Sequence, residues 1–251
     1  MAKEIVLSPA EETSILLEGN FDQNPYAKNL KLSLFNALAM KTKLSDEIKF
    51  MSGMSGKKYR YLVNDLVSLI KDSRYLEIGC WAGSTVCSAL YGNQATALCI
   101  DNWMKFETEE YVKKLYKTKD QKKEFEINTK KVITDKINFK FIESDFRKIN
   151  YHEIGKFNIY CYDALHDEKD QYDGITIVQP ALDKVFILII DDWNWPGVRK
   201  GTFNAINDLN LNIISKIEVR TTQDNNMPKL FLGQYSDWHN GYFIAVCEKS
   251  K

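Results

Sequence analysis

Three aspartates and a histidine follow two apolar runs of the chain, and residues of these types could hold a metal ion and move a proton. Asp163 comes directly after the run 157–162, and Asp191 and Asp192 come directly after the run 185–190. If the runs are adjacent parallel strands, the three carboxylates converge at one edge of a sheet. Converging carboxylates raise one another's pKa unless a cation neutralises them, and all-oxygen ligation suits Mg²⁺, Mn²⁺ or Ca²⁺. The alternative for Asp191 and Asp192 is a helix N-cap with a solvated neighbour.

His166 lies three residues after Asp163 and is the candidate general base. A neutral imidazole there could take a proton from a hydroxyl group whose pKa the metal ion lowers. The other two histidines, His152 and His239, have no acidic neighbours at comparable spacing. The alternative is a structural histidine.

A turn with two glycines follows another apolar run, in the segment 75–85 (YLEIGCWAGST). Gly79 and Gly83 would let the backbone turn tightly and approach a ligand, and a helix expected from Ser84 would point its N-terminus there. Glu77 is an acid inside an apolar strand, where an unpaired charge is costly. The alternative for Glu77 is a buried helix-cap partner.

Acidic residues also follow the next two strand-like runs. Asp101 directly follows the run 97–100, at the end of the expected second strand, and is placed to accept the hydrogen bonds of a ribose diol. Asp145 and Phe146 follow the run 139–142 and could hold an adenine amino group and its ring face. These positions predict a nucleoside-containing cofactor at the carboxyl ends of the strands.

The elements that must position these residues alternate in type. Strand-like runs lie at 75–78, 97–100, 139–142, 157–162 and 185–190, with helix-compatible segments at 84–90, 109–131 and 170–182. Alternation of this kind predicts βαβ units and a mostly parallel sheet. A helix-like segment at 200–209 precedes two closely spaced strand candidates, 212–220 and 241–248, which predict a terminal antiparallel hairpin.

The region before the first strand differs from the rest of the chain. Residues 1–70 show helical patterns at 29–40 and 57–70 and no convincing strand. We therefore expect an N-terminal helical cap at 1–70, part of the same domain as a core at 71–251.

Composition excludes several classes of protein. The 251 residues fit one domain, and 34 basic residues balance 34 acidic ones, so a nucleic-acid binder is not expected. No apolar run reaches the length of a membrane span, and the N-terminus lacks a secretory signal pattern. The five cysteines form no CxxC pair, which favours a reducing, cytoplasmic location.

The sequence E-I-G-C-W-A-G at 77–83, together with Asp101, resembles the first motif and the acidic second-strand terminus of class I S-adenosylmethionine-dependent methyltransferases. The resemblance covers about residues 50–248 and implies a Rossmann-like α/β sheet closed by a C-terminal antiparallel hairpin. The second and third glycine positions of G-x-G-x-x-G are missing, which disfavours a nicotinamide enzyme. In metal-dependent O-methyltransferases of the catechol and caffeoyl type a Met-Ser/Thr loop touches the cofactor, and Met54 and Ser55 stand at the matching place.

The second half of the chain resembles the macrolide-tailoring sugar O-methyltransferases of the macrocin and mycinamicin type. The similarity consists of D-x-x-H at 163–166, the acidic pair at 191–192 and the stretch W-P-G-V-R-K at 195–200. It implies that Asp163, Asp191 and Asp192 hold magnesium and that His166 is the base. Catechol-type enzymes instead carry Asp-Asn at the pair and use a lysine base.

These observations predict a metal-dependent O-methyltransferase that acts on a sugar hydroxyl of a glycan or glycosylated metabolite. The expected cofactor-binding residues are Ser55, Glu77, Gly79, Gly83, Ser84, Asp101, Asn102, Asp145, Phe146 and Asp163. The expected substrate contacts are Trp193, Trp195 and Lys200, within a group of late aromatic residues whose alternative role is core packing. The alternatives are a catechol-type or caffeoyl-type enzyme on a phenol, a cofactor-binding protein without transferase activity, and an iron-dependent oxygenase. A homo-oligomer is a hypothesis that rests on the resemblance alone.

Overall fold

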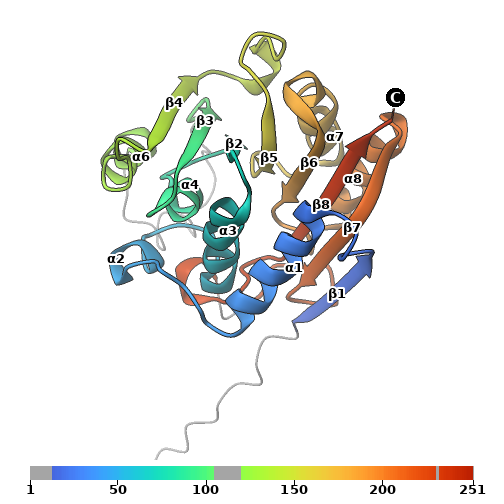
Figure 1. The fold of residues 1–251 in the computed structure, drawn as a ribbon, viewed down its shortest axis with the longest axis horizontal. Coiled ribbons are helices and arrows are strands. Elements are labelled where there is room, and N and C mark those ends of the chain that lie inside the picture. The colour runs from blue at the N-terminus through green and yellow to red at the C-terminus, as the bar shows by residue number, and fades with distance from the viewer. Residues whose placement is uncertain (1–12, 105–119, 230–231, 251) are drawn as a thin grey trace, which may run out of the picture.

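A single eight-stranded sheet forms the centre of the molecule (Figure 1). The computed structural model describes residues 13–104, 120–229 and 232–250. The strands, listed by their bounds, are β1 (Ser14–Gly19), β2 (Arg74–Ile78), β3 (Ala95–Asp101), β4 (Ile137–Glu143), β5 (Phe157–Tyr162), β6 (Leu182–Ile190), β7 (Leu211–Arg220) and β8 (Tyr242–Lys249). Their order in the sheet is β1-β7-β8-β6-β5-β2-β3-β4.

The pairing of the strands confirms the predicted fold class. Strands β2 to β6 pair in parallel, whereas β8 is antiparallel to both β6 and β7. A mostly parallel sheet closed by a C-terminal antiparallel hairpin is the class I methyltransferase variant of the Rossmann-like fold. The apolar run at 185–190 belongs to β6, which lies between β5 and β8 and carries its last five residues fully buried.

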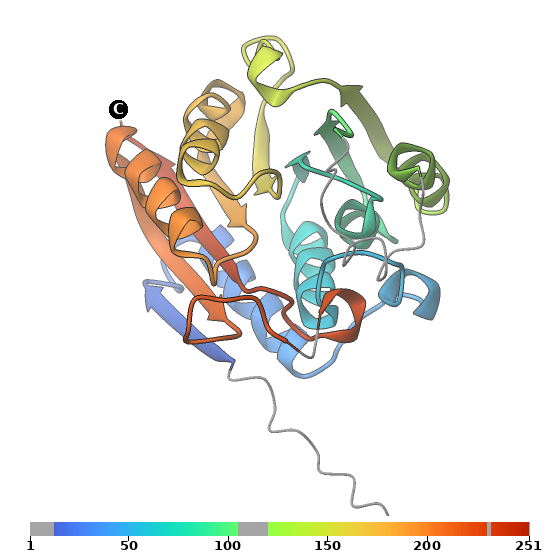
Figure 2. The ribbon, with the colours of Figure 1, turned by 180° about the vertical axis from the view of Figure 1, so that it is seen from behind.

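Helices cover both faces of the sheet. They are α1 (Pro25–Leu38), α2 (Asp46–Lys49), α3 (Lys57–Leu69), α4 (Ser84–Leu90), α6 (Gln121–Lys130), α7 (Glu168–Thr176) and α8 (Pro196–Asp208). Figures 1 and 2 show α1, α3 and α4 on one face and α7 and α8 on the other. Among the described residues, no helix combines the length and the apolar composition that a bilayer crossing requires.

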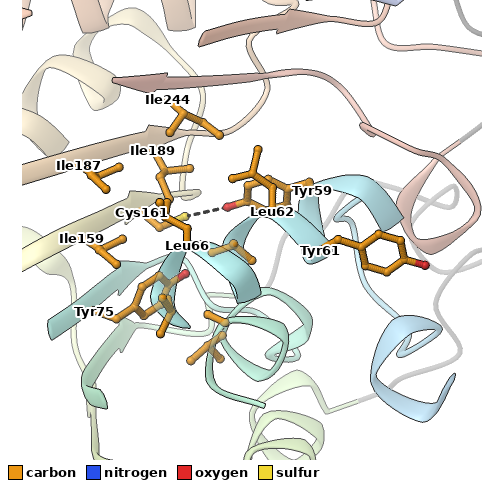
Figure 3. Packing of buried hydrophobic residues seen from close by; sticks show 14 of the residues in the cluster. Tyr59, Tyr61, Leu62, Leu66, Tyr75, Ile159, Cys161, Ile187, Ile189 and Ile244 are labelled. Carbon is orange, nitrogen blue, oxygen red and sulfur yellow. Dashed lines mark hydrogen bonds between the residues drawn. The ribbon is translucent and has the colours of Figure 1, made fainter. Parts of the chain in front are cut away.

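Each face of the sheet has its own hydrophobic core. On the first face, Leu62 and Leu66 of α3 pack against Ile159, Ile189 and Ile244 of three different strands (Figure 3). On the second face, α7 and α8 pack against the alternate residues of the same strands. All five cysteines are buried free thiols.

Two sequence predictions about the elements were wrong. The N-terminal region contains a strand: β1 pairs with β7, from Ser14 opposite Arg220 to Gly19 opposite Ser215. The predicted helix at 170–182 ends at Thr176, and Leu182 already begins β6. The predicted helix at 109–131 corresponds to α6 in its described part, and its residues 109–119 lie outside the described residues.

Candidate active site

The strand register places the predicted site residues in one row at the carboxyl edge of the parallel strands. The last paired row runs through Ile100, Ile78, Tyr162, Ile190 and Phe243, and these side chains face the second core. Side chains alternate between faces along a strand, so the next row faces the first core. That row consists of Asp101, Gly79, Asp163, Asp191 and Tyr242. The sheet itself thus brings carboxylates from β3, β5 and β6 to one edge.

His166 lies among the carboxylates, as the spacing predicted. Its Nε2 atom is 2.8 Å from Oδ2 of Asp192 and 3.7 Å from Oδ1 of Asp163. Asp192 has a left-handed backbone (φ 56°), which breaks the strand alternation after Asp191. Two consecutive carboxylates can therefore serve the same site.

The ionisable groups of this cluster shift one another's pKa values. Burial raises the pKa of Asp191 well above its usual value, and the carboxylates of Asp163 and Asp192 raise it further. Burial also raises the pKa of Asp163, although His166 opposes the shift. Burial would raise the pKa of Asp192 too, but His166 holds it below its usual value. Burial lowers the pKa of His166, yet Asp192 and Asp163 outweigh it and raise that pKa to about 10. At neutral pH His166 is thus a cation within the cluster.

The oxygen atoms of the cluster are not arranged as a finished metal site. Within the described ranges, no group of three or more His, Cys, Asp or Glu side chains is positioned to hold a metal ion. Among the described residues, Oδ1 of Asp191 nevertheless has no hydrogen-bond partner, and it is buried. Buried carboxylate oxygens normally have a donor or a cation beside them, so this atom marks a place for one.

Two residues that were not predicted as site residues, Asn240 and Arg199, stabilise the turn at Asp191 and Asp192 through hydrogen bonds. Asn240 donates from Nδ2 to Oδ1 of Asp192 at 2.8 Å. Arg199 donates from Nη1 to the carbonyl oxygens of Trp193 (2.8 Å) and Asn194 (2.5 Å). Arg199 belongs to the W-P-G-V-R-K stretch, so its sequence motif was visible, but its contact with this turn was not. The stretch fixes the turn that carries the acidic pair.

Gly79 occupies the β2 position of this edge row, and the backbone of Asp163 leaves no room there for a side chain. Its φ is +85°, and an added Cβ would lie 1.8 Å from the carbonyl oxygen of Asp163. The glycine therefore lets β2 and β5 remain close at the edge where the carboxylates meet.

Replacing Gly79 with alanine should lower the free energy of unfolding by about 3 kcal/mol or more, because backbone overlap adds to left-handed strain. Urea unfolding measures this change. The matched control is Gly155→Ala, since Gly155 has φ +98° but nothing within 4 Å of its added Cβ. Gly155→Ala should cost only about 1–2 kcal/mol. Equal losses in the two variants would contradict the close approach at Gly79.

Asp101 already accepts three backbone hydrogen bonds. The donors are the N–H groups of Cys80 (2.7 Å), Trp81 (2.8 Å) and Trp103 (2.7 Å). A carboxylate offers about four lone-pair sites, so Asp101 retains room for at most one further donor of this kind. Asp101 thus ties the Gly79–Gly83 turn to the end of β3.

Ser55, Gly83 and Ser84 come together at the start of α4. Oγ of Ser55 lies 3.2 Å from Oγ of Ser84, and both residues are buried. Gly83 precedes Ser84 with φ +85°. Two residues 29 positions apart in the sequence therefore meet at the start of α4.

Glu77 lies on β2 two positions before Gly79, on the first-core side, and is buried. Tyr75 donates a hydrogen bond to Oε2 of Glu77, whereas Oε1 is buried and has no partner in the part of the chain that the structure describes. Burial raises the pKa of Glu77 to about 8. Glu77 is therefore mainly uncharged at neutral pH, with one oxygen still to be satisfied.

The residues predicted for the adenine have other contacts. Phe146 is 6% exposed, and its ring lies 5.7 Å from the ring of Tyr162 and 4.4 Å from the guanidinium of Arg147. Asp145 caps the short helix at 146–148 by accepting from the N–H of Arg147. Little of the Phe146 ring face remains for a ligand. Asn102 is exposed and accepts from the N–H of Met104.

The predicted substrate residues separate into three environments. Trp195 lies at the site, with its ring 5.1 Å from that of His166. Trp193 is instead fully buried in the second core, stacked on Phe243 and donating from Nε1 to Glu218. Lys200 is exposed on α8 and pairs with Glu168. Trp193 faces the core because its position after the turn continues the second face of the sheet.

Trp193→Phe tests this core position. We expect a loss of about 1–3 kcal/mol in the free energy of unfolding, because Glu218 loses a buried donor and a cavity opens. Thermal unfolding measures it, and Tyr235→Ala, at a side chain that is 69% exposed, should change stability by less than about 0.5 kcal/mol. Unchanged stability of Trp193→Phe would contradict a core role.

The solved structures that are similar to this chain include methyltransferases. The SAH-bound methyltransferase PaMTH1 of Podospora anserina has 12% identity and a TM-score of 0.49, over 93% of this chain and 90% of that one. The ribosomal protein L11 methylase of Lactobacillus delbrueckii subsp. bulgaricus has 12% identity and a TM-score of 0.45, over 77% of this chain and 78% of that one. No protein-family model matches the sequence, and no curated protein matches it.

Proposed function

We propose that this protein is an S-adenosylmethionine-dependent, divalent-metal-dependent O-methyltransferase that methylates a sugar hydroxyl. The observation that carries the proposal is the convergence of Asp163, Asp191, Asp192 and His166 at the edge of a methyltransferase-type sheet. Their charges and the unpartnered Oδ1 of Asp191 fit a divalent cation, which is a hard ion that prefers carboxylate oxygens.

In the proposed reaction, the three carboxylates, His166 and the Gly79–Ser84 turn have separate roles. Asp163, Asp191 and Asp192 would hold the cation, which when bound neutralises these carboxylates and polarises an acceptor hydroxyl. His166, no longer facing uncompensated carboxylates, is then neutral and takes the hydroxyl proton at Nε2. Glu77 and the Gly79–Ser84 turn hold the cofactor beside the acceptor. In-line transfer of a methyl group depends mainly on such positioning.

A sugar acceptor is supported by the groups around His166. An aliphatic hydroxyl ionises with difficulty, so a base within reach of the acceptor is needed, and His166 is such a base. The ring of Trp195 lies beside His166, and aromatic rings commonly pack against sugar rings. Two neighbouring sugar oxygens could complete the ligand set of a cation held by three carboxylates.

The second candidate is a catechol-type or caffeoyl-type O-methyltransferase acting on a phenol. It is supported by Met54 and Ser55, which stand where those enzymes carry a Met-Ser/Thr loop that touches the cofactor; in this structure Ser55 lies against Ser84 at the start of α4. Phenols ionise more easily than sugar hydroxyls, so that reaction would depend less on His166.

The decisive experiment is calorimetric titration with S-adenosylmethionine, followed by transfer assays on a panel of monosaccharide glycosides and catechols. We expect cofactor binding and Mg²⁺-stimulated methylation of a glycoside that EDTA abolishes. No cofactor binding would reject the methyltransferase proposal as a whole. Transfer to catechols alone would favour the second candidate, and transfer that is insensitive to EDTA would remove the metal from the proposal.

A further inference from the structure

His239 is a second histidine that the fold brings to the candidate active site. It lies in the loop between the short helix η3 (Gly233–Tyr235) and β8, and its side chain is 4% exposed. The next residue along the chain, Asn240, donates the hydrogen bond that holds Asp192. The carboxylate of Asp192 and the imidazole of His166 both act electrostatically on His239. The ring therefore lies within the field of the residues that we assign to the metal and the proton.

A hydrogen bond fixes which nitrogen of His239 carries the proton. The backbone N–H of Gly233 donates to Nδ1 at 3.0 Å. A ring nitrogen that accepts a hydrogen bond carries no proton, so the neutral imidazole is protonated at Nε2. Burial lowers the pKa of His239 to about 4; Asp192 opposes this shift, and the charges of His166 and Arg60 add to it. His239 is therefore neutral at physiological pH and presents an N–H donor at Nε2.

The backbone on either side of this ring is also held. The N–H of His239 donates to Oγ of Ser236 at 2.8 Å, and its carbonyl oxygen accepts from Oγ1 of Thr221 at 2.9 Å. The backbone of His239 is left-handed, with φ 43°. The direction of the Nε2 donor is thus set before any ligand binds, as is required of a group that orients a substrate.

The donor at Nε2 is left for a ligand. Within the described ranges, the hydrogen bond from Gly233 is the only one that the side chain of His239 makes. Polar groups that are as buried as this one normally have a partner on each side.

The order of the strands indicates which ligand this donor meets. β6 and β8 lie on one side of β5, whereas β2 and β3 lie on the other. The Gly79–Ser84 turn and Asp101, which we assign to the cofactor, follow β2 and β3. His239 precedes β8 and belongs with Asp192 on the opposite side, where the acceptor is expected.

We propose that His239 is a specificity-determining residue, which donates a hydrogen bond from Nε2 to an acceptor hydroxyl other than the one that is methylated. This inference rests on the proposed function. The two histidines then have different roles. His166 takes the proton of the reacting hydroxyl, whereas His239 keeps its proton and holds a neighbouring oxygen of the same sugar.

Two substitutions separate this role from the structural contact of Nδ1. In His239→Asn, the amide oxygen stands as many bonds from the backbone as Nδ1 does, so it can still accept from Gly233, but the Nε2 donor is lost. Asparagine also adopts left-handed backbone readily. In His239→Gln, the amide nitrogen stands as many bonds from the backbone as Nε2 does, so a donor is kept, but the acceptor for Gly233 is lost.

The probe is the methyl glycoside that the unmodified protein methylates fastest, assayed beside its monodeoxy analogues. His239→Asn should raise the KM for this glycoside about threefold to tenfold, as expected for one hydrogen bond, with kcat within about twofold. The unmodified protein should show the same loss with one monodeoxy analogue, and His239→Asn should show no additional loss with that analogue.

The matched measurements are the melting temperature and the Kd of S-adenosylmethionine. His239→Asn should leave both nearly unchanged, whereas His239→Gln should melt at a lower temperature and keep a KM closer to that of the unmodified protein. An unchanged KM in His239→Asn, or a weakened cofactor affinity in its place, would overturn the role of His239 and leave the proposed function standing. An unmodified protein that methylates no glycoside would reject the proposed function and this inference with it.

Discussion

Asp191→Asn should lower kcat for methyl transfer at least about a hundredfold while leaving the Kd of S-adenosylmethionine within about threefold. The amide keeps the shape of the carboxyl group but removes a negative charge from the proposed metal-binding set. Raising the Mg²⁺ concentration should restore part of the rate, because the variant binds the cation more weakly. Initial rates over a Mg²⁺ series measure both effects.

The same variant should remain well folded. Burial and the neighbouring carboxylates raise the pKa of Asp191 well above its usual value, so the structure already disfavours a negative charge there. We expect the free energy of unfolding without Mg²⁺ to change by no more than about 1 kcal/mol. Asp135→Asn, at an exposed aspartate, serves as the control and should retain full activity. Full activity of Asp191→Asn would disprove its role in metal binding.

His166→Ala should lower kcat for a sugar acceptor by about 10²–10⁴-fold without weakening cofactor binding. The variant removes the one side chain that we assign to proton removal from the acceptor hydroxyl. Single-turnover assays with saturating cofactor isolate the chemical step from product release. A methylated product should still form slowly, because positioning of the two reactants contributes independently of the base.

His152→Ala is the matched control for the histidine experiment. His152 is exposed and follows a different strand, so its replacement should not change the rate. Retention of most of the sugar activity by His166→Ala would remove His166 from the mechanism. Retention with a catechol but not with a sugar would indicate that the site accepts both acceptors and needs the base for one.

The central elements of the fold were predictable because their sequence signals are local. The bounds of β5 and α4 were predicted as the structure has them, at 157–162 and 84–90. All residues of both elements are buried, and their sequences contain no charged residue, so the local sequence is sufficient to predict them. β1 was missed because it is a short edge strand whose existence depends on pairing with β7, about two hundred residues later.

The site was predictable where it depends on strand ends and not where it depends on loops. Asp163 and Asp191 follow their strands directly, so the sheet alone brings them together. Phe146 and Trp193 follow strands too, but local turns send their rings into the second core. The spacing of residues along the chain does not predict towards which face of the sheet a turn directs the next side chain.

The supporting residues were less visible in the sequence. Asn240 and Arg60 act on segments that are distant along the chain or that have no regular pattern. The buried position of Arg60 is the clearest case, because an arginine in an amphipathic helix normally indicates a solvent-facing position. Arg60 donates to the carbonyl oxygens of Ile48, Lys49 and Met51, and no rule of sequence spacing predicts these contacts.

The pairing of β1 with β7 can form only after β7 has been made, because synthesis runs from the N-terminus towards the C-terminus. Residues 14–19 are made about two hundred residues before their partners at 215–220. Until then Leu16 and Leu17, which remain partly exposed even in the folded protein, have no strand beside them. Contacts of such long sequence separation form late. We therefore expect β1 to be among the last of the described strands to join the sheet during folding.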